Sequence, residues 1–390
     1  MRATTQGTSY SIVEAPDRTC LRLDGGARRG TAIVAISREA ARAEDDARLL
    51  YAHSIFWESR EIYLALLDLG FDVDVIDLGA PTPVDAGPYQ VSLTFHYQLL
   101  MVEAHLAPGA IRITWLTGSY APTQNAREIK RVRALEQRRD CNYEPKRQVP
   151  HVDAELAAID RADHCILVGN SVTLDTYPKR WHHKIETFCV SAGNIDYVKA
   201  PGDFIPGRRE FLWYSASGAV LKGLDLLLDL FSDRELPTLH IVGALNEEHD
   251  FLNIYHSELD DHPRIRMHGF LHGNDPKLAE VYDRCVAVLH PSAAEGMSGS
   301  VAHCLRVGLY PVISRVSGID LPDGCGRYLE DCTLEEIEVA IRDVLEMPEA
   351  DLCRQIGVLQ AMAEERFSRT SYARRLREVL GRYVAGVPIR

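Results

Sequence analysis

Two stretches in the second half of the chain carry residues suited to binding a phosphorylated ligand. The first reads Phe211-Leu-Trp-Tyr-Ser-Ala-Ser217-Gly218-Ala-Val-Leu-Lys222-Gly, which is a strand pattern, a turn of small residues and the start of a helix pattern. Backbone N–H groups in such a turn can approach an anion near a helix start, and the ammonium group of Lys222 adds a point charge there. Phosphate suits this geometry. The alternative is a solvated lysine in front of an amphipathic helix.

The second stretch is again a strand, a loop and a helix. It reads Val286-Ala-Val-Leu-His290-Pro-Ser-Ala-Ala-Glu295-Gly296-Met297-Ser298-Gly299-Ser300-Val-Ala-His303. The carboxylate of Glu295, at the carboxyl end of the strand, can accept hydrogen bonds from sugar hydroxyls. The segment from Ser298 to Ser300 offers hydroxyls and free amides at a helix start, which is a second anion-binding terminus. The alternative makes Ser298 a helix N-cap and Glu295 an ordinary loop carboxylate.

Alternating strand and helix patterns surround these two stretches. In the first half, strands are expected at 31–36, 71–76, 91–95, 111–115 and 165–168, with a helix at 57–69. In the second half, strands are expected at 211–215, 238–242, 264–269, 286–290 and 310–314, with helices at 223–231, 250–259, 276–285 and 300–307. This order predicts an α/β protein with two doubly wound domains, whose ligands bind outside the carboxyl ends of the strands. The cleft between the two domains is the expected active site.

The domain boundary is predicted in the segment 201–209, which is rich in Pro, Gly and charge. Residues 1–28 are predicted to be a polar, weakly ordered extension. Residues 29–203 would form a Rossmann-like acceptor domain, and residues 204–390 a Rossmann-like donor domain that ends in helices. The last helix, at about 371–384, could pack on either domain.

Together the motifs resemble a known family. Lys222-Gly in the first βα unit of the second domain, His290-Pro-Ser-x-x-Glu295-Gly, and then Gly308-x-x-Pro-Val-Ile-Ser314 resemble the retaining glycosyltransferases of family 4, the glycosyl transferases group 1. The resemblance is specific over about residues 205–345 and looser over 30–200. It implies the GT-B architecture, with two Rossmann-like domains facing a central cleft. It also implies transfer of a sugar from a nucleoside-diphosphate sugar to an acceptor hydroxyl with retention of anomeric configuration.

The resemblance assigns roles to several residues. Lys222 matches the lysine that contacts the donor diphosphate, and Glu295 matches the carboxylate that faces the donor sugar. His303 stands where the family usually has a second, ribose-binding glutamate, and an imidazole can still hydrogen-bond a hydroxyl. Ser217 stands where the family has an arginine. The diphosphate is then expected to rely on Lys222, the amides of the Ser217–Gly218 turn and the amides near Ser298–Ser300, and Gly296, Met297 and Gly299 complete the predicted donor site.

Candidates in the first domain are weaker. The family leads us to expect a histidine after a strand near the transferred sugar, but Leu116 stands there. His96, at the end of the strand at 91–95, is the alternative catalytic histidine, although a lone histidine at a strand end is more often structural. Polar groups that follow strands and could face the acceptor are Arg38, Thr117, Gly118 and Ser119.

Composition and charge bear on partners and location. The formal net charge of -13 argues against nucleic-acid binding, because such proteins need a cationic surface. The chain begins without a signal-peptide pattern and contains no apolar run of membrane-spanning length, and its nine scattered cysteines lack zinc-site spacing, so we expect a cytoplasmic protein with reduced, mostly buried thiols. The basic segment 127–147 is interpreted as a solvated helix face with internal ion pairs, or alternatively as a contact for an anionic acceptor or a peripheral membrane contact.

The sequence leaves the substrates open. The donor could be UDP-, GDP- or ADP-linked, with base recognition expected in the loops 242–246 and 269–274, and the acceptor could be a sugar, a lipid or a natural product. No cofactor besides the nucleotide sugar and no metal is expected, because no Asp-x-Asp pair lies in a suitable loop. Two other functions remain: a catalytically altered GT-B protein that acts as a binding or partner subunit, and a GT-B epimerase or phosphorylase.

Overall fold

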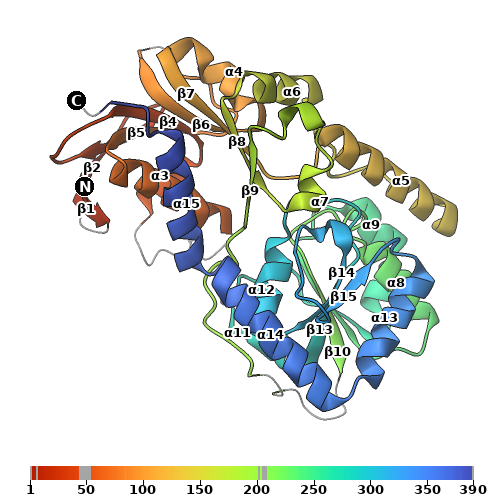
Figure 1. Ribbon diagram of the computed structural model, residues 1–390. Helices are drawn as coiled ribbons and strands as arrows, with labels where there is room; N and C mark the ends of the chain where they lie inside the picture. Colours follow the sequence, from red (N-terminus) through yellow and green to blue (C-terminus); the bar gives the residue numbers. More distant parts are fainter. Residues whose placement is uncertain are drawn as a thin grey trace.

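The structure is a computed structural model that describes residues 2–5, 8–43, 54–83, 85–200, 203, 209–273 and 275–388. These residues form two α/β domains, which lie one above the other in Figure 1. A nine-stranded sheet belongs to the first domain and a six-stranded sheet to the second. The predicted fold class, an α/β protein with two Rossmann-like domains, is confirmed.

The first sheet has the strand order β1-β2-β3-β5-β4-β6-β7-β8-β9. Its strands are β1 (Arg2–Thr5), β2 (Thr8–Glu14), β3 (Thr19–Leu23), β4 (Gly30–Ile36), β5 (Phe71–Asp77), β6 (Tyr89–Phe95), β7 (Leu106–Leu116), β8 (His164–Val168) and β9 (Ile185–Phe188). The helices of this domain are α1 (Arg38–Arg42), α3 (Ser54–Asp68), α4 (Leu99–Val102), α5 (Ala121–Arg139), α6 (Val152–Arg161) and α7 (Ser171–Leu174). From β5 to β9 all neighbouring strands are parallel, and the strand order reverses between β4 and β6.

The first residues of the chain extend this sheet and make it mixed. β2 pairs with β3 and β3 pairs with β5, both antiparallel, and Arg22 on β3 forms a 2.5 Å salt bridge with Asp74 on β5. The predicted weakly ordered extension over residues 1–28 is therefore wrong where β2 and β3 lie. The segment Thr8–Glu14 is rich in Thr, Tyr, Ile and Val, and this strand-forming content outweighs its polar character.

The second sheet is parallel throughout and has the order β12-β11-β10-β13-β14-β15, which is the order of a doubly wound fold. Its strands are β10 (Glu210–Tyr214), β11 (Leu239–Val242), β12 (Ile265–Met267), β13 (Cys285–His290), β14 (Tyr310–Ser314) and β15 (Arg327–Leu329). The helices are α8 (Leu224–Asp233), α9 (His249–Ile254), α10 (His256–Asp260), α11 (Pro276–Arg284), α12 (Gly299–Val307), α13 (Leu334–Glu346), α14 (Glu349–Phe367) and α15 (Arg369–Tyr383). β13 is buried along its whole length, as expected for a parallel strand covered on both faces.

Some predicted elements differ from the structure. The predicted helix at 250–259 is two helices, α9 and α10, which meet at the fully buried Tyr255. The short strand β9 was not predicted. Most of the predicted linker at 201–209 lies outside the described residues.

The end of the chain returns to the first domain. α14 packs along the second domain, and α15 lies beside α3 in Figure 1. Arg377 of α15 forms salt bridges with Glu61 (3.0 Å) and Asp68 (2.9 Å) of α3. The last helix therefore packs on the first domain, and the chain passes twice between the domains.

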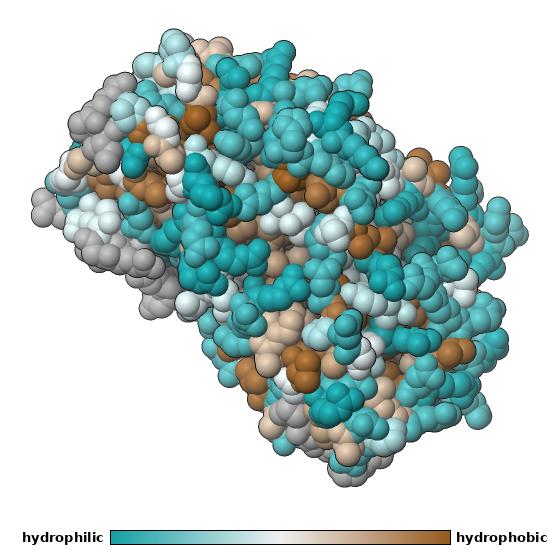
Figure 2. Space-filling view, in the orientation of Figure 1, coloured by the Kyte–Doolittle hydropathy of each residue, from teal (hydrophilic) through white to brown (hydrophobic). Residues whose placement is uncertain are grey.

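The surface and the helices bear on the predicted membrane contact. None of the described helices is long and apolar enough to cross a membrane. Hydrophilic residues prevail on the face shown in Figure 2, and apolar residues are scattered among them. A peripheral contact stays a prediction.

Candidate active site

A cavity of about 410 Å³ lies between the two domains. The first domain contributes side chains at or just beyond the carboxyl ends of its strands, namely Ile36, Phe95, Trp115, Thr117 and Val168. The second domain contributes residues that follow β10 and β13, among them Ser217, Lys222, Glu295, Ser298 and His303. β10 and β13 flank the point where the strand order of the second sheet reverses, which is where doubly wound folds bind ligands. The cavity therefore lies in the predicted cleft.

The turn after β10 is held against the turn after β13. Ala293 donates its backbone N–H to the carbonyl of Leu221 (2.8 Å). Gly223, at φ 76°, precedes α8, and a β-carbon there would lie 2.4 Å from the carbonyl oxygen of Pro291. Only glycine fits this close contact. The contact between the two turns brings Lys222 beside the second motif.

Lys222 and Glu295 form an ion pair inside the cavity. The carboxylate of Glu295 also accepts hydrogen bonds from Nε2 of His290 (2.9 Å) and from Oγ of Ser292 (3.3 Å). Burial raises the pKa of Glu295, but the charge of Lys222 and the hydrogen bond from His290 outweigh burial and lower it to about 2. Glu295 is therefore an anion at any physiological pH, and the two predicted residues lie together.

The turn that carries Ser217 and Gly218 is partly occupied by another acid. Glu248, 4% exposed, accepts hydrogen bonds from the backbone N–H groups of Gly218 (2.6 Å) and Ala219 (3.1 Å). The amide of Gly218, predicted to bind phosphate, is thus bound to a carboxylate in this structure. Ser217 lines the cavity, and its hydroxyl accepts a hydrogen bond from the guanidinium of Arg147 (3.4 Å).

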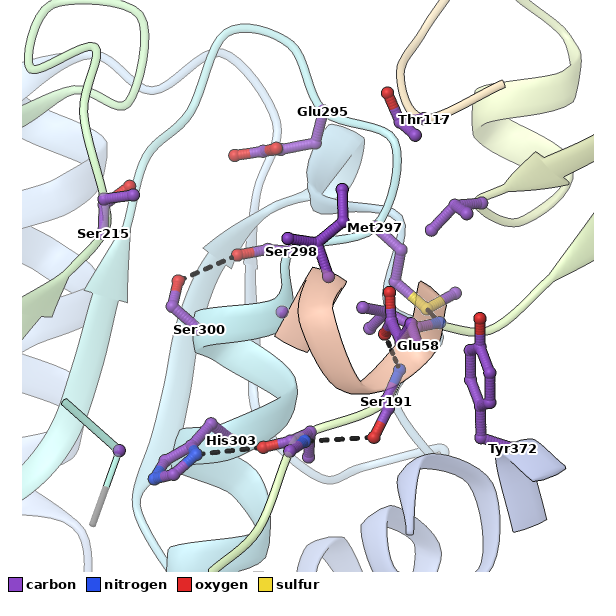
Figure 3. A pocket seen from close by; sticks show the side chains of 18 of the residues that line it. Glu58, Thr117, Ser191, Ser215, Glu295, Met297, Ser298, Ser300, His303 and Tyr372 are labelled. Carbon is purple, nitrogen blue, oxygen red and sulfur yellow. Dashed lines mark hydrogen bonds between the residues drawn. The ribbon is translucent and has the colours of Figure 1, made fainter. Parts of the chain in front are cut away.

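The start of α12 faces the cavity. Ser298 is the N-cap, and its Oγ accepts a hydrogen bond from the backbone N–H of Val301 (3.4 Å) and lies 3.2 Å from Oγ of Ser300. Figure 3 shows the two hydroxyls turned toward each other. Met297 and Gly299 also line the cavity. Ser298 is therefore both a cap and a wall of the site, as the two interpretations of this motif separately proposed.

Gly296 lies at the contact between the domains. A β-carbon there would lie 2.4 Å from the carbonyl oxygen of Thr117 and 2.5 Å from that of Val168, both in the first domain. Its own carbonyl accepts a hydrogen bond from Oγ1 of Thr173 (2.8 Å). The structure therefore gives Gly296 a packing role at the domain contact, where no side chain fits.

His303 lines the cavity from α12 and is 6% exposed. Its Nδ1 lies 3.0 Å from the carbonyl oxygen of Ala192 and must carry the proton of that hydrogen bond. Burial lowers the pKa of His303 to about 4, so the ring is neutral and Nε2 is an acceptor. Among the described residues nothing donates to this Nε2. It can accept a hydrogen bond from a ligand hydroxyl.

His96 reaches the cavity through a neighbour. It follows β6 in the left-handed region, at φ 49°. Its Nδ1 lies 2.8 Å from the carboxylate of Glu155, and its Nε2 lies 2.9 Å from Oγ1 of Thr117. In the neutral ring, Nδ1–H donates to the carboxylate and Nε2 accepts from the Thr117 hydroxyl. Thr117 lines the cavity, whereas His96 is outside the set of described lining residues.

The remaining first-domain candidates lie outside that set too. The guanidinium of Arg38 donates to the carbonyl of Ala15 (2.7 Å) and so holds the connection between β2 and β3. The carbonyl of Gly118 accepts a hydrogen bond from the hydroxyl of Tyr177 (2.8 Å), and Ser119 is buried. Of the four predicted acceptor-side residues, Thr117 alone is in the cavity wall as described.

Sequence reasoning missed a carboxyl group in the cavity. Glu58 lines the cavity from α3 and accepts a hydrogen bond from the backbone N–H of Ser191 (2.8 Å). Burial raises the pKa of Glu58 to about 7, despite this bond and the nearby charge of Arg369. Figure 3 shows it close to Tyr372 of α15. No motif marks this position, because Glu58 is one of several polar residues in a helix pattern.

The basic segment 127–147 joins the two domains. Arg138 forms salt bridges with Asp225 (2.6 Å) and Asp229 (2.7 Å), both on α8. Further pairs join Arg139 to Asp229 and Glu258, and Lys146 to Asp250. Figure 1 shows α5 extending from the first domain beside the second. The predicted solvated face with internal ion pairs is therefore wrong, because the partner acids are distant in the sequence.

The loops expected to recognise the base are only partly at the cavity. Phe270 and Gly273 line it, whereas Asn274 lies outside the described residues. In the described part of the chain, no group of three or more His, Cys, Asp or Glu side chains could hold a metal ion. The expectation that no metal takes part stays a prediction.

A family model matches the part of the chain that carries the two motifs. Residues 209–347 match the model described as "Glycosyl transferases group 1". The matched segment contains both predicted motifs and the two turns that form the Lys222–Glu295 pair. The fold is that of a GT-B protein, and the second domain is the part of the chain that matches the glycosyl transferases group 1. The chain is a glycosyltransferase that uses a nucleoside-diphosphate sugar, as the sequence predicts.

Solved structures resemble the whole chain in fold. Sucrose-phosphate synthase from Thermosynechococcus elongatus has 14% sequence identity and a TM-score of 0.63, with 91% of this chain and 99% of that chain covered. HepE from Anabaena in complex with UDP-glucose has 15% identity and a TM-score of 0.60, with 90% and 100% covered. A glycosyltransferase from Rickettsia africae has 12% identity and a TM-score of 0.57, with 92% and 99% covered. No curated protein matches the sequence.

Proposed function

We propose that this protein transfers a hexose from a UDP-sugar to a hydroxyl group of an acceptor with an apolar body, with retention of anomeric configuration. The observation that carries the proposal is the ion pair of Lys222 and Glu295 at the switch point of the second sheet. UDP is favoured over GDP and ADP because HepE, a neighbour of the same fold, binds UDP-glucose.

Lys222 would bind the diphosphate and stabilise the charge that develops on it as the sugar leaves. An ammonium has three N–H donors, so Lys222 can keep its bond to Glu295 and still reach a phosphate oxygen. Glu295 would accept hydrogen bonds from hydroxyls of the transferred sugar. In a retaining transfer on one face of the sugar, the leaving diphosphate would take the proton of the acceptor hydroxyl.

The nucleoside would lie toward His303. Nε2 of His303 is buried, unprotonated and without a hydrogen-bond donor in the described structure. A ribose hydroxyl would supply that donor. An unpaired buried acceptor is unfavourable by about 1–3 kcal/mol, so filling it adds to affinity.

The acceptor would enter the half of the cavity that belongs to the first domain. Its walls there are mainly apolar, with Ile36, Ile55, Phe95, Trp115 and Val168. Thr117 and Glu58 are two of the polar groups in this half of the cavity and could bind the reacting hydroxyl. Such walls favour a lipid or natural product over a free sugar. We also propose a cytosolic location, which the nine free and mostly buried cysteines support.

A screen of nucleotide sugars tests the function. Purified protein is incubated with UDP-, GDP- and ADP-glucose and with UDP-N-acetylglucosamine, and release of nucleotide and thermal stabilisation are measured. Stabilisation and slow hydrolysis with UDP-sugars are expected. A binding or partner subunit would release no nucleotide from any donor, and a protein that binds no nucleotide at all would contradict the proposal.

A further inference from the structure

Arg147 of the first domain faces the turn after β10 in the second domain, which carries Ser217 and Gly218. It lines the cavity together with Lys222, and its Nη1 lies 3.4 Å from Oγ of Ser217. Gly218 makes room for it, because a β-carbon at that position would lie 2.6 Å from Cγ of Arg147. The guanidinium therefore lies over the same turn that ends in Lys222.

Arg147 differs from the other cations around it. Arg138, Arg139 and Lys146 each form a salt bridge with a carboxylate of the second domain. In the parts of the chain that the structure describes, the guanidinium of Arg147 has no carboxylate partner and donates to a hydroxyl. A guanidinium over a ligand cavity without an anion is suited to binding one from solution.

The backbone around Arg147 is fixed. Oε1 of Glu128, which is 1% exposed, accepts hydrogen bonds from the backbone N–H groups of Lys146 (2.9 Å) and Arg147 (2.7 Å). The side chain of Gln124 donates to the carbonyl of Arg147 (2.7 Å). A buried acid and an amide of α5 thus hold the backbone of an exposed arginine on both sides. This fixed backbone lowers the conformational entropy lost when Arg147 binds a ligand.

The charges in the cavity call for a second cation. Lys222 is already paired with Glu295, so its charge is partly neutralised before the donor binds. Each phosphate of a nucleoside diphosphate is negatively charged, and a guanidinium binds phosphate oxygens in pairs, which an ammonium does not. The Gly218 amide, which was predicted to bind phosphate, already donates its hydrogen bond to Glu248.

We propose that Arg147 binds the donor diphosphate across the cleft from Lys222, so that the diphosphate site is completed by the first domain. This inference rests on the proposed function. The salt bridges of Arg138 and Arg139 to α8 and α10 hold α5 on the second domain, and so Arg147 keeps its place over the turn without further domain closure.

The test compares UDP with UMP, because a diphosphate contact distinguishes them. Dissociation constants are measured by calorimetry for the wild type, Arg147→Ala, Arg147→Gln and the control Lys146→Ala, together with the melting temperature of each. Arg147→Ala should weaken UDP about tenfold or more and UMP less than about threefold, since a charge-assisted bond to the second phosphate is lost. Lys146→Ala, which removes a neighbouring charge that is paired with Asp250, should leave both within about twofold.

A rescue variant separates ligand binding from packing. Ser217→Arg in the Arg147→Ala background returns a guanidinium to the same turn from the other domain, and it should restore UDP affinity to within about threefold of the wild type. Equal loss of UDP and UMP, or unchanged UDP affinity in both Arg147 variants, would overturn the inference while the function stands. A wild type that binds no nucleoside diphosphate would overturn both. Arg147→Gln keeps a donor for Ser217 and remains informative if the alanine variant does not fold.

Discussion

Lys222 and Glu295 are 73 residues apart in the chain and are bound to each other in the cavity between the domains. Their pairing means that the cation proposed to bind phosphate and the anion proposed to face the sugar neutralise each other before a donor arrives. The donor therefore exchanges one set of charge contacts for another. It does not bring charge to an unpaired lysine.

Loss of Lys222 should reduce catalysis more than binding. In Lys222→Ala we expect turnover of the nucleotide sugar to fall about 10²–10³-fold, because charge on the leaving diphosphate loses its cation. Initial rates at saturating donor measure the effect, and circular dichroism checks the fold. Normal turnover in this variant would remove Lys222 from the mechanism.

Glu295→Gln should separate sugar orientation from nucleotide binding. The amide keeps the size of the side chain but frees Lys222 from its ion pair, so UDP should bind as tightly as to the wild type or tighter. Turnover should fall about 10²-fold because the contact to the transferred sugar is weakened. Calorimetry with UDP and initial rates with the UDP-sugar give the two values. Weaker UDP binding together with normal turnover would contradict this role of Glu295.

His303→Phe should abolish recognition of a ribose hydroxyl. The ring still fills the space, but Nε2 is lost, and UDP should bind about tenfold more weakly. The wild type should discriminate against 2′-deoxy-UDP or 3′-deoxy-UDP, and the variant should not. If the variant still discriminates between UDP and both deoxy analogues as the wild type does, His303 does not contact the ribose.

Glu58 should make stability depend on pH. Its pKa in the folded protein is about 7, above the ordinary value of 4.5, so the stability linked to its protonation is complete below about pH 4.5 and is lost as the pH rises through 7. Glu58→Gln should therefore be more stable than the wild type at pH 8 by about 1–3 kcal/mol and nearly equal at pH 4.5. Urea unfolding at both pH values measures this. An equal difference at the two pH values would contradict the assignment.

The ion pairs of α5 should hold the domains together. Arg138→Ala leaves Asp225, which is fully buried, without a main partner, and we expect a loss of about 2–4 kcal/mol of unfolding free energy. Arg133→Ala, on the exposed side of the same helix, is the matched control and should change stability by less than about 0.5 kcal/mol. Thermal and urea unfolding give the comparison. Similar losses in the two variants would show that the salt bridges contribute little.

The fold and the centre of the site follow from local patterns. The strand, turn and helix signals at 211–231 and 286–307 place Lys222 and Glu295 in one predicted donor site, because ligands of doubly wound sheets bind outside the carboxyl ends of the strands. Both residues line the cavity, and their ion pair with each other was not predicted. Residues that follow a strand within one strand–turn–helix unit can therefore be assigned to a site from the sequence alone.

The features of the fold and the site that sequence patterns did not predict depend on contacts between distant segments. The partners of Arg138 are on α8, about 90 residues later, and no local spacing indicates them. Glu248 and Gly218 meet in the same way, which no motif predicts. β2 and β3 were missed because the first 28 residues are polar, and the two strands form by antiparallel pairing with each other and with β5, which no local spacing indicates. Arg38 was predicted to face the acceptor because it follows a strand. Its guanidinium instead donates to the carbonyl of Ala15 in the β2–β3 connection.

The chain crosses twice between the domains, and the two crossings are joined. Ala192, in the first crossing, donates its backbone N–H to the carbonyl of Phe367, in the second (2.9 Å). Any rotation of one domain against the other must turn about this joined line. His303 is bonded to the same Ala192 and therefore lies at this line, whereas the salt bridges of Arg138 and Arg139 tie α5 to the second domain. A nucleoside bound at His303 would stay at the axis of such a rotation, and the ion pairs of α5 would have to break before the domains could turn.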